Sequence, residues 1–274
     1  MWHLSLLLSK LFDLLLTPLE SLPPFWSLFI FSISTGILML LIFRYTSNQK
    51  GIKETKNRIK AHLMEIRLFK DDLGLLLSAQ KNLLIYNAKY MKHAVKPMLF
   101  MIVPVSVILI QLHCWFGYRP LKIGESTILK VKVDEWKKVL SGISIEVDEG
   151  IIVETPPLMI SEKREVCWRI RANMLGEHKI LVKTVDYAFQ KKVLVSDEKL
   201  GRISPSRVKS NLWDNLVSPG EKPIIENSLV NRIEVDYPER SIEILGLRTH
   251  WLIIFFVLSI VSGFILKGFF RVEL

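Results

Sequence analysis

The sequence has few of the residues from which metal centres, disulfide frameworks and catalytic sites are built. Only two of its 274 residues are cysteines, Cys114 and Cys167. Its six histidines are scattered, and no group of His and Cys has metal-ligand spacing. No phosphate-binding glycine loop and no nucleophile paired with a base is present. We therefore expect no metal, no cofactor and no enzyme activity. We expect two free thiols, and a disulfide in an oxidising compartment remains the alternative.

The first 22 residues lack the marks of a cleaved secretory signal. No basic segment precedes the apolar run, no small-x-small cleavage site follows it, and Lys10 and Asp13 interrupt it. Polar residues recur every four positions, which places them in one narrow stripe: Ser5, Ser9, Asp13 and Thr17. Residues 1–22 are therefore expected to form an amphipathic helix in the outer membrane interface. A signal anchor or a cleaved peptide remains the alternative.

Charged residues are absent from three apolar runs, Phe25–Phe43, Met98–Phe116 and Trp251–Leu266. Each is close to the roughly 20 residues needed to cross a hydrocarbon core of about 30 Å. The sequence therefore predicts an α-helical integral membrane protein with three transmembrane helices, at residues 23–45, 97–117 and 249–270. Pro104 is expected to kink the second of them.

Positive charge is concentrated between the first two runs. The chain carries a net charge of +10, of which residues 45–96 contribute +7 and residues 117–250 only +2. Short loops rich in Lys and Arg stay in the cytosol, so residues 46–96 and the tail 271–274 are expected there. This orientation places the N-terminus outside and the C-terminus inside the cell (inner or plasma) membrane. A nucleic-acid-binding role of the basic stretch is disfavoured because the stretch lies between two apolar runs.

The basic stretch 46–96 has the pattern of a coiled-coil hairpin. Apolar residues lie seven apart in two rows: Ile52, Ile59, Ile66 and Leu73, with Leu63, Leu77 and Leu84 beside them. Asp71, Asp72 and Gly74 provide a break between two helices of similar length. One long bent helix is the alternative. The element is also typical of a dimerisation coiled coil.

Residues 118–248 change to short alternating runs separated by turn residues. Leu129–Val133 and Val166–Ile170 alternate apolar with polar side chains, and further short runs follow up to residue 196. Six or seven such strands predict an inserted extracytoplasmic all-β domain, an immunoglobulin-like sandwich with Trp168 in its core. The less regular part, 197–247, is expected to connect the sandwich to the third apolar run. The partner of such a domain is unknown.

This order of elements resembles the Oxa/YidC superfamily of membrane-protein insertases, and is most similar to its three-span branch. The resemblance is carried by LMLLIFRYTSNQKGIKETKNRIKAHLMEIRLFKDD and KPMLFMIVPVSVILIQL, within residues 1–116, and by the third apolar run. It implies an insertase or chaperone that moves segments of newly made membrane proteins through a polar groove, without a covalent step. It also implies contact with lipid, with nascent clients and, through the basic hairpin, with the ribosome. The chain departs from the family by the roughly 130 residues inserted before the third run.

Small and hydroxyl residues in the apolar runs are the candidates for such a groove. They share helical faces at i, i+3 and i+4 spacing, and Gln111 adds an amide in the second run: Ser32, Thr35, Gly36, Gln111, Ser259, Ser262 and Gly263. Arg44 and Lys267 are expected at its cytosolic mouth. Tight helix packing and snorkelling to headgroups are the alternative roles of these residues. At the level of function, the alternative is a membrane-anchored scaffold whose β-sandwich recognises a partner.

Overall fold

The computed structural model describes residues 2–134, 136, 142–197, 200–209, 221–244 and 246–273. The side chains of residues 1–6 and 244 lie outside this description, and so does the expected place of Ser5 in the polar stripe. The chain forms two compact units. The first comprises Met1–Leu28 and Ile108–Trp251, and the second comprises Phe29–Val107 and Leu252–Leu274.

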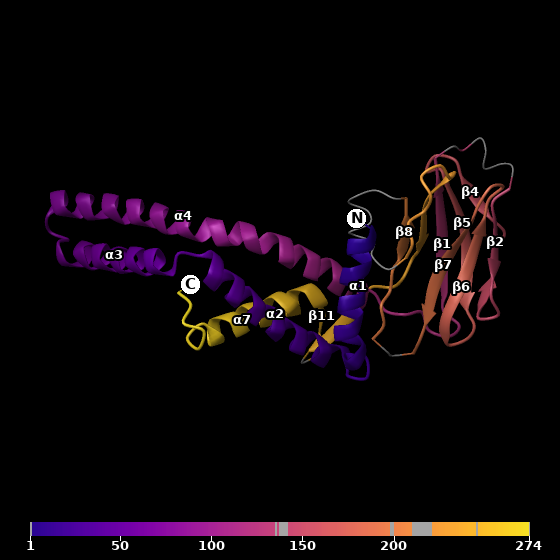
Figure 1. Cartoon of the computed structure of the whole chain (residues 1–274), viewed down its shortest axis with the longest axis horizontal. Helices are drawn as coiled ribbons and strands as arrows, with labels where there is room; N and C mark the ends of the chain where they lie inside the picture. The colour runs from indigo at the N-terminus through magenta and orange to yellow at the C-terminus, as the bar shows by residue number, and fades with distance from the viewer. Residues whose placement is uncertain are drawn as a thin grey trace. The chain divides into compact units, whose positions relative to one another are not determined.

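Helices make up the second unit. Helices α3 and α4 run antiparallel, joined by a short turn (Figure 1). Side-chain caps fix the starts of both helices: Asn48 accepts the Gly51 N–H at 3.0 Å before α3, and Asp72 accepts the Gly74 N–H at 2.9 Å in the turn before α4. The helices that contribute to this unit are α2 (Pro24–Thr46), α3 (Gln49–Leu68), α4 (Leu73–Leu112) and α7 (Trp251–Leu266).

Helix α4 corrects the expected boundary between hairpin and second span. It runs without a break through the boundary expected after residue 96, and both Pro97 and Pro104 lie inside it. It continues as a π-helical turn over His113–Gly117. By length and composition, α2 and the stretch Leu73–Gly117 are apolar enough to cross a membrane, whereas the apolar helix α7 is shorter, with 16 residues.

The hairpin buries part of the first predicted row and exposes the second. Ile52 is buried and Ile59 and Ile66 are half-buried, as a coiled-coil seam requires. The second row is wrong for α4, because Leu77 and Leu84 are 63% and 71% exposed. The side chains of α4 that turn inward are instead Leu76, Ala79, Leu83, Tyr86 and Tyr90. Leu63 and Leu73 are exposed as well.

The first unit joins a helical segment to a two-sheet β structure. One sheet has the order β3-β5-β1-β9-β8, with β4 also pairing β5, and the other has the order β2-β6-β7. The helical segment is α1 (Trp2–Leu16) and the 3-10 helix η1 (Thr17–Leu19). The strands are β1 (Ser126–Val133), β2 (Ser144–Val147), β3 (Ile151–Val153), β4 (Leu158–Ile160), β5 (Glu165–Ala172), β6 (Gly176–Lys183), β7 (Ala188–Val195), β8 (Ser206–Val208), β9 (Val230–Val235), β10 (Ser241–Ile244) and β11 (Leu247–His250).

Alternating apolar side chains from both sheets form one core. Leu129 and Val131 of β1, Ile180 and Val182 of β6 are fully buried, and Trp168 is buried among them as expected. The free thiols of Cys114 and Cys167 are both buried. The segment read as irregular contains β8, β9 and the hairpin of β10 with β11, in which Gly246 takes a positive φ of 82°.

Candidate functional site

Within the second unit, α2 and α7 meet along the small-residue faces found in the sequence. A methyl group added at Gly36 would lie 2.2 Å from the Ser262 hydroxyl and 2.8 Å from the Ser259 carbonyl oxygen. Both distances are shorter than any real Cβ contact, so only glycine allows this approach. Ser32 and Thr35 are buried on the same side of α2, and Ser262 is buried on α7. Three of the predicted residues, Gly36, Ser259 and Ser262, are thus brought together in a helix–helix contact.

The hydroxyl groups along this contact are turned toward their own helices. Thr35 Oγ1 donates to the Phe31 carbonyl at 2.9 Å, and Ser262 Oγ donates to the Ser259 carbonyl at 2.9 Å. Such bonds satisfy a polar group inside apolar surroundings. At the level of Gly36 the geometry therefore favours the packing role over a water-filled groove.

The remaining predicted residues of this unit lie outside the contact. Gly263 has open space where a side chain would begin. Lys267 is exposed, with its ammonium 5.1 Å from the centre of the Phe264 ring, and Arg44 is exposed at the end of α2.

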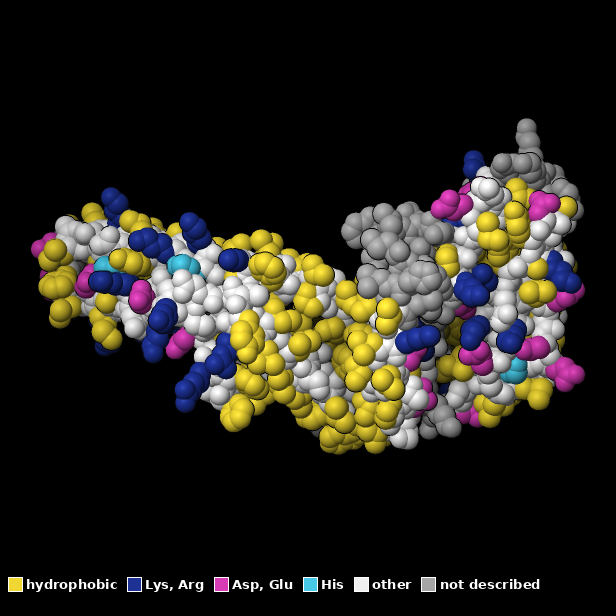
Figure 2. Space-filling model, viewed as in Figure 1, with side chains coloured by type: hydrophobic (Ala, Val, Ile, Leu, Met, Phe, Trp, Pro, Cys, Tyr) yellow, Lys and Arg dark blue, Asp and Glu magenta, His cyan; other side chains and the backbone are white. Residues whose placement is uncertain are grey.

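The apolar part of α4 behaves differently from α2 and α7. None of the ten side chains from Met98 to Val107 is buried, and Val103 is 68% exposed. Figure 2 shows hydrophobic side chains gathered over the apolar helices, and Lys and Arg side chains over the hairpin and over the β structure. An apolar helix with no buried side chain over three turns presents surface to lipid or to another helix.

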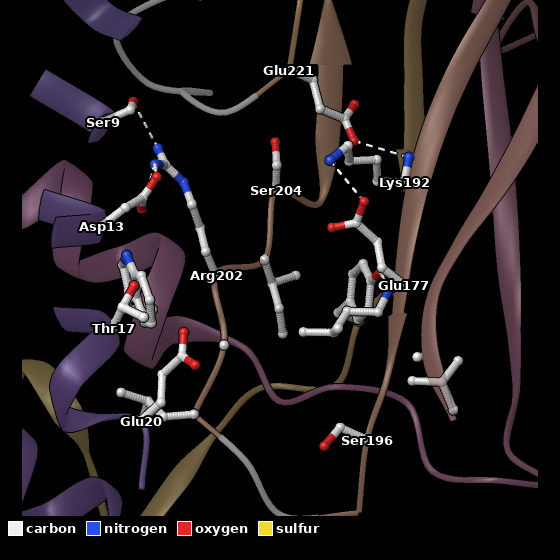
Figure 3. Close-up of a pocket in the computed structure, with 18 of the residues that line it drawn as sticks. Ser9, Asp13, Thr17, Glu20, Glu177, Lys192, Ser196, Arg202, Ser204 and Glu221 are labelled. Carbon is white, nitrogen blue, oxygen red and sulfur yellow. Dashed lines mark hydrogen bonds and ion pairs between the residues drawn. The ribbon is translucent and has the colours of Figure 1, made fainter. Parts of the chain in front are cut away.

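Gln111, the amide predicted in the second apolar run, has a polar partner. It belongs to the first unit, is 3% exposed, and accepts a hydrogen bond from Arg202 Nη2 at 3.3 Å. The same guanidinium donates to Asp13 at 2.8 and 2.9 Å and to Ser9 at 2.8 Å. Figure 3 shows Arg202 reaching these two residues of α1. The polar stripe of α1 is thus held by a half-buried cation.

A cavity of about 1000 Å³ lies beside Arg202, between α1 and the β7 edge. Its walls carry buried polar atoms without partners among the described residues: Trp115 Nε1, Arg202 Nε and Glu221 Oε2. Glu221 accepts from the buried Lys191 ammonium and from the Lys192 backbone N–H, both at 3.0 Å. Because burial disfavours the ammonium, the pKa of Lys191 lies below its ordinary value.

One residue of the sequence, Asp13, indicates that a partner such as Arg202 is required. Asp13 stands in an otherwise apolar helix, and a carboxylate in such a position needs a cation close by. The cation comes from a segment 189 residues away that has no periodic pattern. The spacing of residues in the sequence therefore could not predict which cation pairs with Asp13.

Removing the Arg202 guanidinium is expected to destabilise the first unit. Arg202→Gln leaves Asp13 and Gln111 without their shared donor, so we expect a loss of about 1.5–3 kcal/mol in the free energy of unfolding. Urea unfolding followed by tryptophan fluorescence measures it. Arg232→Gln, at a loosely paired surface site, is the control and should stay within about 0.5 kcal/mol of the parent. Equal stability of the two variants would contradict the assignment.

The geometry described so far supports binding and packing, and points to no reacting pair. Among the described residues, no three His, Cys, Asp or Glu side chains converge as metal ligands would. Comparison of the chain with protein-family models, curated proteins and solved structures finds no match. The function of the protein is therefore inferred from the arrangement of its helices.

Proposed function

We propose that the protein is a membrane-protein insertase or chaperone of the Oxa/YidC type, integral to the cell membrane with its hairpin in the cytosol. One observation carries the proposal: α2 and α7 pack closely, while the apolar stretch Met98–Val107 of α4 buries no side chain. A bundle that served only as an anchor would be expected to bury one face of each helix. The open stretch suits a transient occupant, namely a client helix.

An insertase of this kind lowers a solvation barrier. A charged side chain at the bilayer centre costs about 2.5–3.5 kcal/mol on insertion scales, so polar client segments need a protein surface beside them. The paired helices α2 and α7 would provide a rigid wall, and α4 would provide an exchangeable apolar surface. Packing against small residues and van der Waals contact would hold the client until it partitions into lipid.

The hairpin adds a surface suited to early capture of clients or the ribosome. Its tip exposes flexible apolar side chains, with Met64 71% and Leu68 73% exposed. A shallow hollow beside them is lined by Ala61, Met64, Glu65, Arg67 and Leu68. Exposed Met and Leu next to basic residues fit an apolar client segment, and the net charge of +7 fits ribosomal RNA or anionic lipid.

Site-specific photo-crosslinking tests the proposal. A photoreactive residue at Val103 should form adducts with a nascent single-span client during synthesis in the presence of membranes. Val185, in the first unit, is the matched control because it is the same residue type and is 70% exposed against 68% for Val103. Adducts from Val185 and none from Val103 would sink the insertase proposal.

The β structure supports a second candidate, a membrane-anchored scaffold. Its strand order places β4, β5, β1 and β9 in one sheet and β2, β6 and β7 in the other. This is similar to the D-E-B-A and C-F-G sheets of an immunoglobulin-like sandwich, with β9 in the place of the first strand. Strands β3 and β4 expose apolar side chains, with Ile152 44% and Leu158 63% exposed. As a scaffold, the chain would lose its partner in Leu158→Asp; as an insertase, it would keep client crosslinking in that variant.

A further inference from the structure

The first unit contains a second cavity, of about 580 Å³, at the ends of apolar segments. Four parts of the chain line it: residues 20–24, which lead into α2; residues 119, 120 and 122, which follow the end of α4; residues 196–197, which follow β7; and residues 239–241, which precede α7 by one hairpin. Its volume is in the range of small-molecule sites. If these helices cross a membrane, the cavity lies at the depth of the outer headgroups.

Arg240 is the unusual side chain of this cavity. It is 8% exposed, its Nε donates to the Tyr118 carbonyl at 3.1 Å, and its Nη2 is buried with no hydrogen-bond partner. Among the described residues no carboxylate forms an ion pair with it. Burying a guanidinium without a counter-ion costs free energy, unless an anion binds to it.

The positive charges next to Arg240 make the binding of an anion there more favourable. Burial and repulsion from Arg119 lower the pKa of Arg240 to about 10, so the group remains a cation at neutral pH. The guanidinium of Arg119 is already bound by Glu125, at 2.7 and 2.8 Å. Lys122 adds a further cation to the lining. Of these two guanidinium groups, that of Arg240 therefore has a buried donor atom, Nη2, without a hydrogen-bond partner among the described residues.

The rest of the lining suits a group that carries both charges. The carboxylates of Glu20, Asp197 and Glu239 also line the cavity, which gives it acidic as well as basic walls. Leu22, 38% exposed, lines it on the α2 side, and Trp26, 53% exposed, follows one turn later. A tryptophan and a leucine in this position are typical of the membrane interface, where acyl chains begin.

We propose that this cavity binds the headgroup of an amine-bearing phospholipid such as phosphatidylethanolamine, with its phosphate on Arg240 and its ammonium on the carboxylate wall. The phosphate would accept from Nη2 and from Lys122, as charge-assisted hydrogen bonds. The acyl chains would leave past Leu22 and Trp26. The inference depends on the membrane placement within the proposed function, and needs no client.

Native mass spectrometry of the full-length protein in detergent tests the site. Phosphatidylethanolamine, phosphatidylglycerol and inorganic phosphate are the three probes. We expect phosphatidylethanolamine to be retained best and Arg240→Gln to weaken its binding at least tenfold, with Arg232→Gln as the unaffected control. Equal retention by the parent and Arg240→Gln would overturn the proposal, as would equal binding of phosphatidylglycerol. Inorganic phosphate that binds and displaces the lipid without preference for it would show a free-phosphate site instead.

A second variant keeps the site testable if Arg240→Gln fails to fold. Lys122→Gln lies at the exposed edge of the cavity, so it should leave folding intact and weaken lipid retention by a smaller factor. No loss in this variant together with an unfolded Arg240→Gln would also count against the site. Because the assay contains no client, its outcome is independent of crosslinking at Val103. The insertase proposal and the lipid site can therefore fail separately.

Discussion

Replacing the buried Lys191 by methionine is expected to cost about 3–5 kcal/mol of the free energy of unfolding, because it leaves the Glu221 carboxylate buried without its cation. Lys191 is fully buried, and its ammonium lies 3.0 Å from Glu221 and donates to the Ser204 carbonyl. That contact uses Glu221 Oε1, and Glu221 Oε2 is buried without a partner among the described residues. Denaturant unfolding of the purified protein, followed by tryptophan fluorescence, gives the free energy.

Two further variants separate the pair from simple packing. Lys192→Met removes the neighbouring lysine, which is half-exposed and pairs with Glu177 at 2.7 Å, and should cost at most about 1 kcal/mol. The double variant Lys191→Met with Glu221→Leu removes both charges and should recover most of the loss. A double variant as unstable as the single one would show that the site depends on packing instead of charge.

The same lysine predicts how stability depends on pH. Its pKa is lowered in the folded protein from the ordinary value of 10.5, so over the range between the two values the unfolded chain binds more protons. The contribution of Lys191 to stability therefore rises as pH increases through that range toward 10.5. Unfolding curves of the parent and the double variant at a series of alkaline pH values measure this contribution. The free energy of unfolding of the parent minus that of the double variant should grow through the range and become constant above pH 10.5.

The second large effect is expected at Gly36. Gly36→Leu places a side chain where the Ser259 carbonyl oxygen lies 2.8 Å from the first added carbon, so α2 and α7 must separate. Overpacking of this kind typically costs 1–3 kcal/mol, and we expect client crosslinking at Val103 to fall with it. Thermal unfolding in detergent and the crosslinking assay measure the two effects.

Gly263→Leu is the matched control for Gly36→Leu. It makes the same chemical change on the partner helix, at a site where an added carbon meets no atom within 4 Å. Stability and crosslinking should therefore stay at the parent level. If both variants behave alike, the close contact between α2 and α7 is needed neither for stability nor for client crosslinking.

Local patterns in the sequence predicted the elements well where one physical rule dominates. Alternating side chains located β1 and β5, and the absence of charge located α2 and α7, since burial in a core or in lipid leaves a strong periodic or continuous signal. Asp72 was found as a break because its side chain can cap only a helix start. The short strands β4 and β8 were missed, because three residues are too few to show alternation.

Contacts between distant segments could not be predicted in the same way. Leu77 and Leu76 are adjacent leucines, and only the direction in which α4 leaves the turn decides which faces α3. Gln111 was assigned to a groove from its helical face, but its partner Arg202 comes from a segment without a pattern. The faces of Gly36 and Ser262 were recognised, whereas their tight contact depends on how two helices meet.

The pairing of β1 with β9 has a consequence for biosynthesis. β1 is the first strand after α4 and β9 precedes the hairpin leading to α7, yet Leu129 and Val235 are register partners. The sheet thus lacks an inner strand, β9, until about a hundred more residues have left the ribosome, and such distant pairing forms slowly. Closure of the domain and emergence of the last apolar helix then fall at nearly the same moment of translation. The finished domain brings the incoming and outgoing ends of its chain to neighbouring strands, which is the geometry that lets a domain be inserted between two helices.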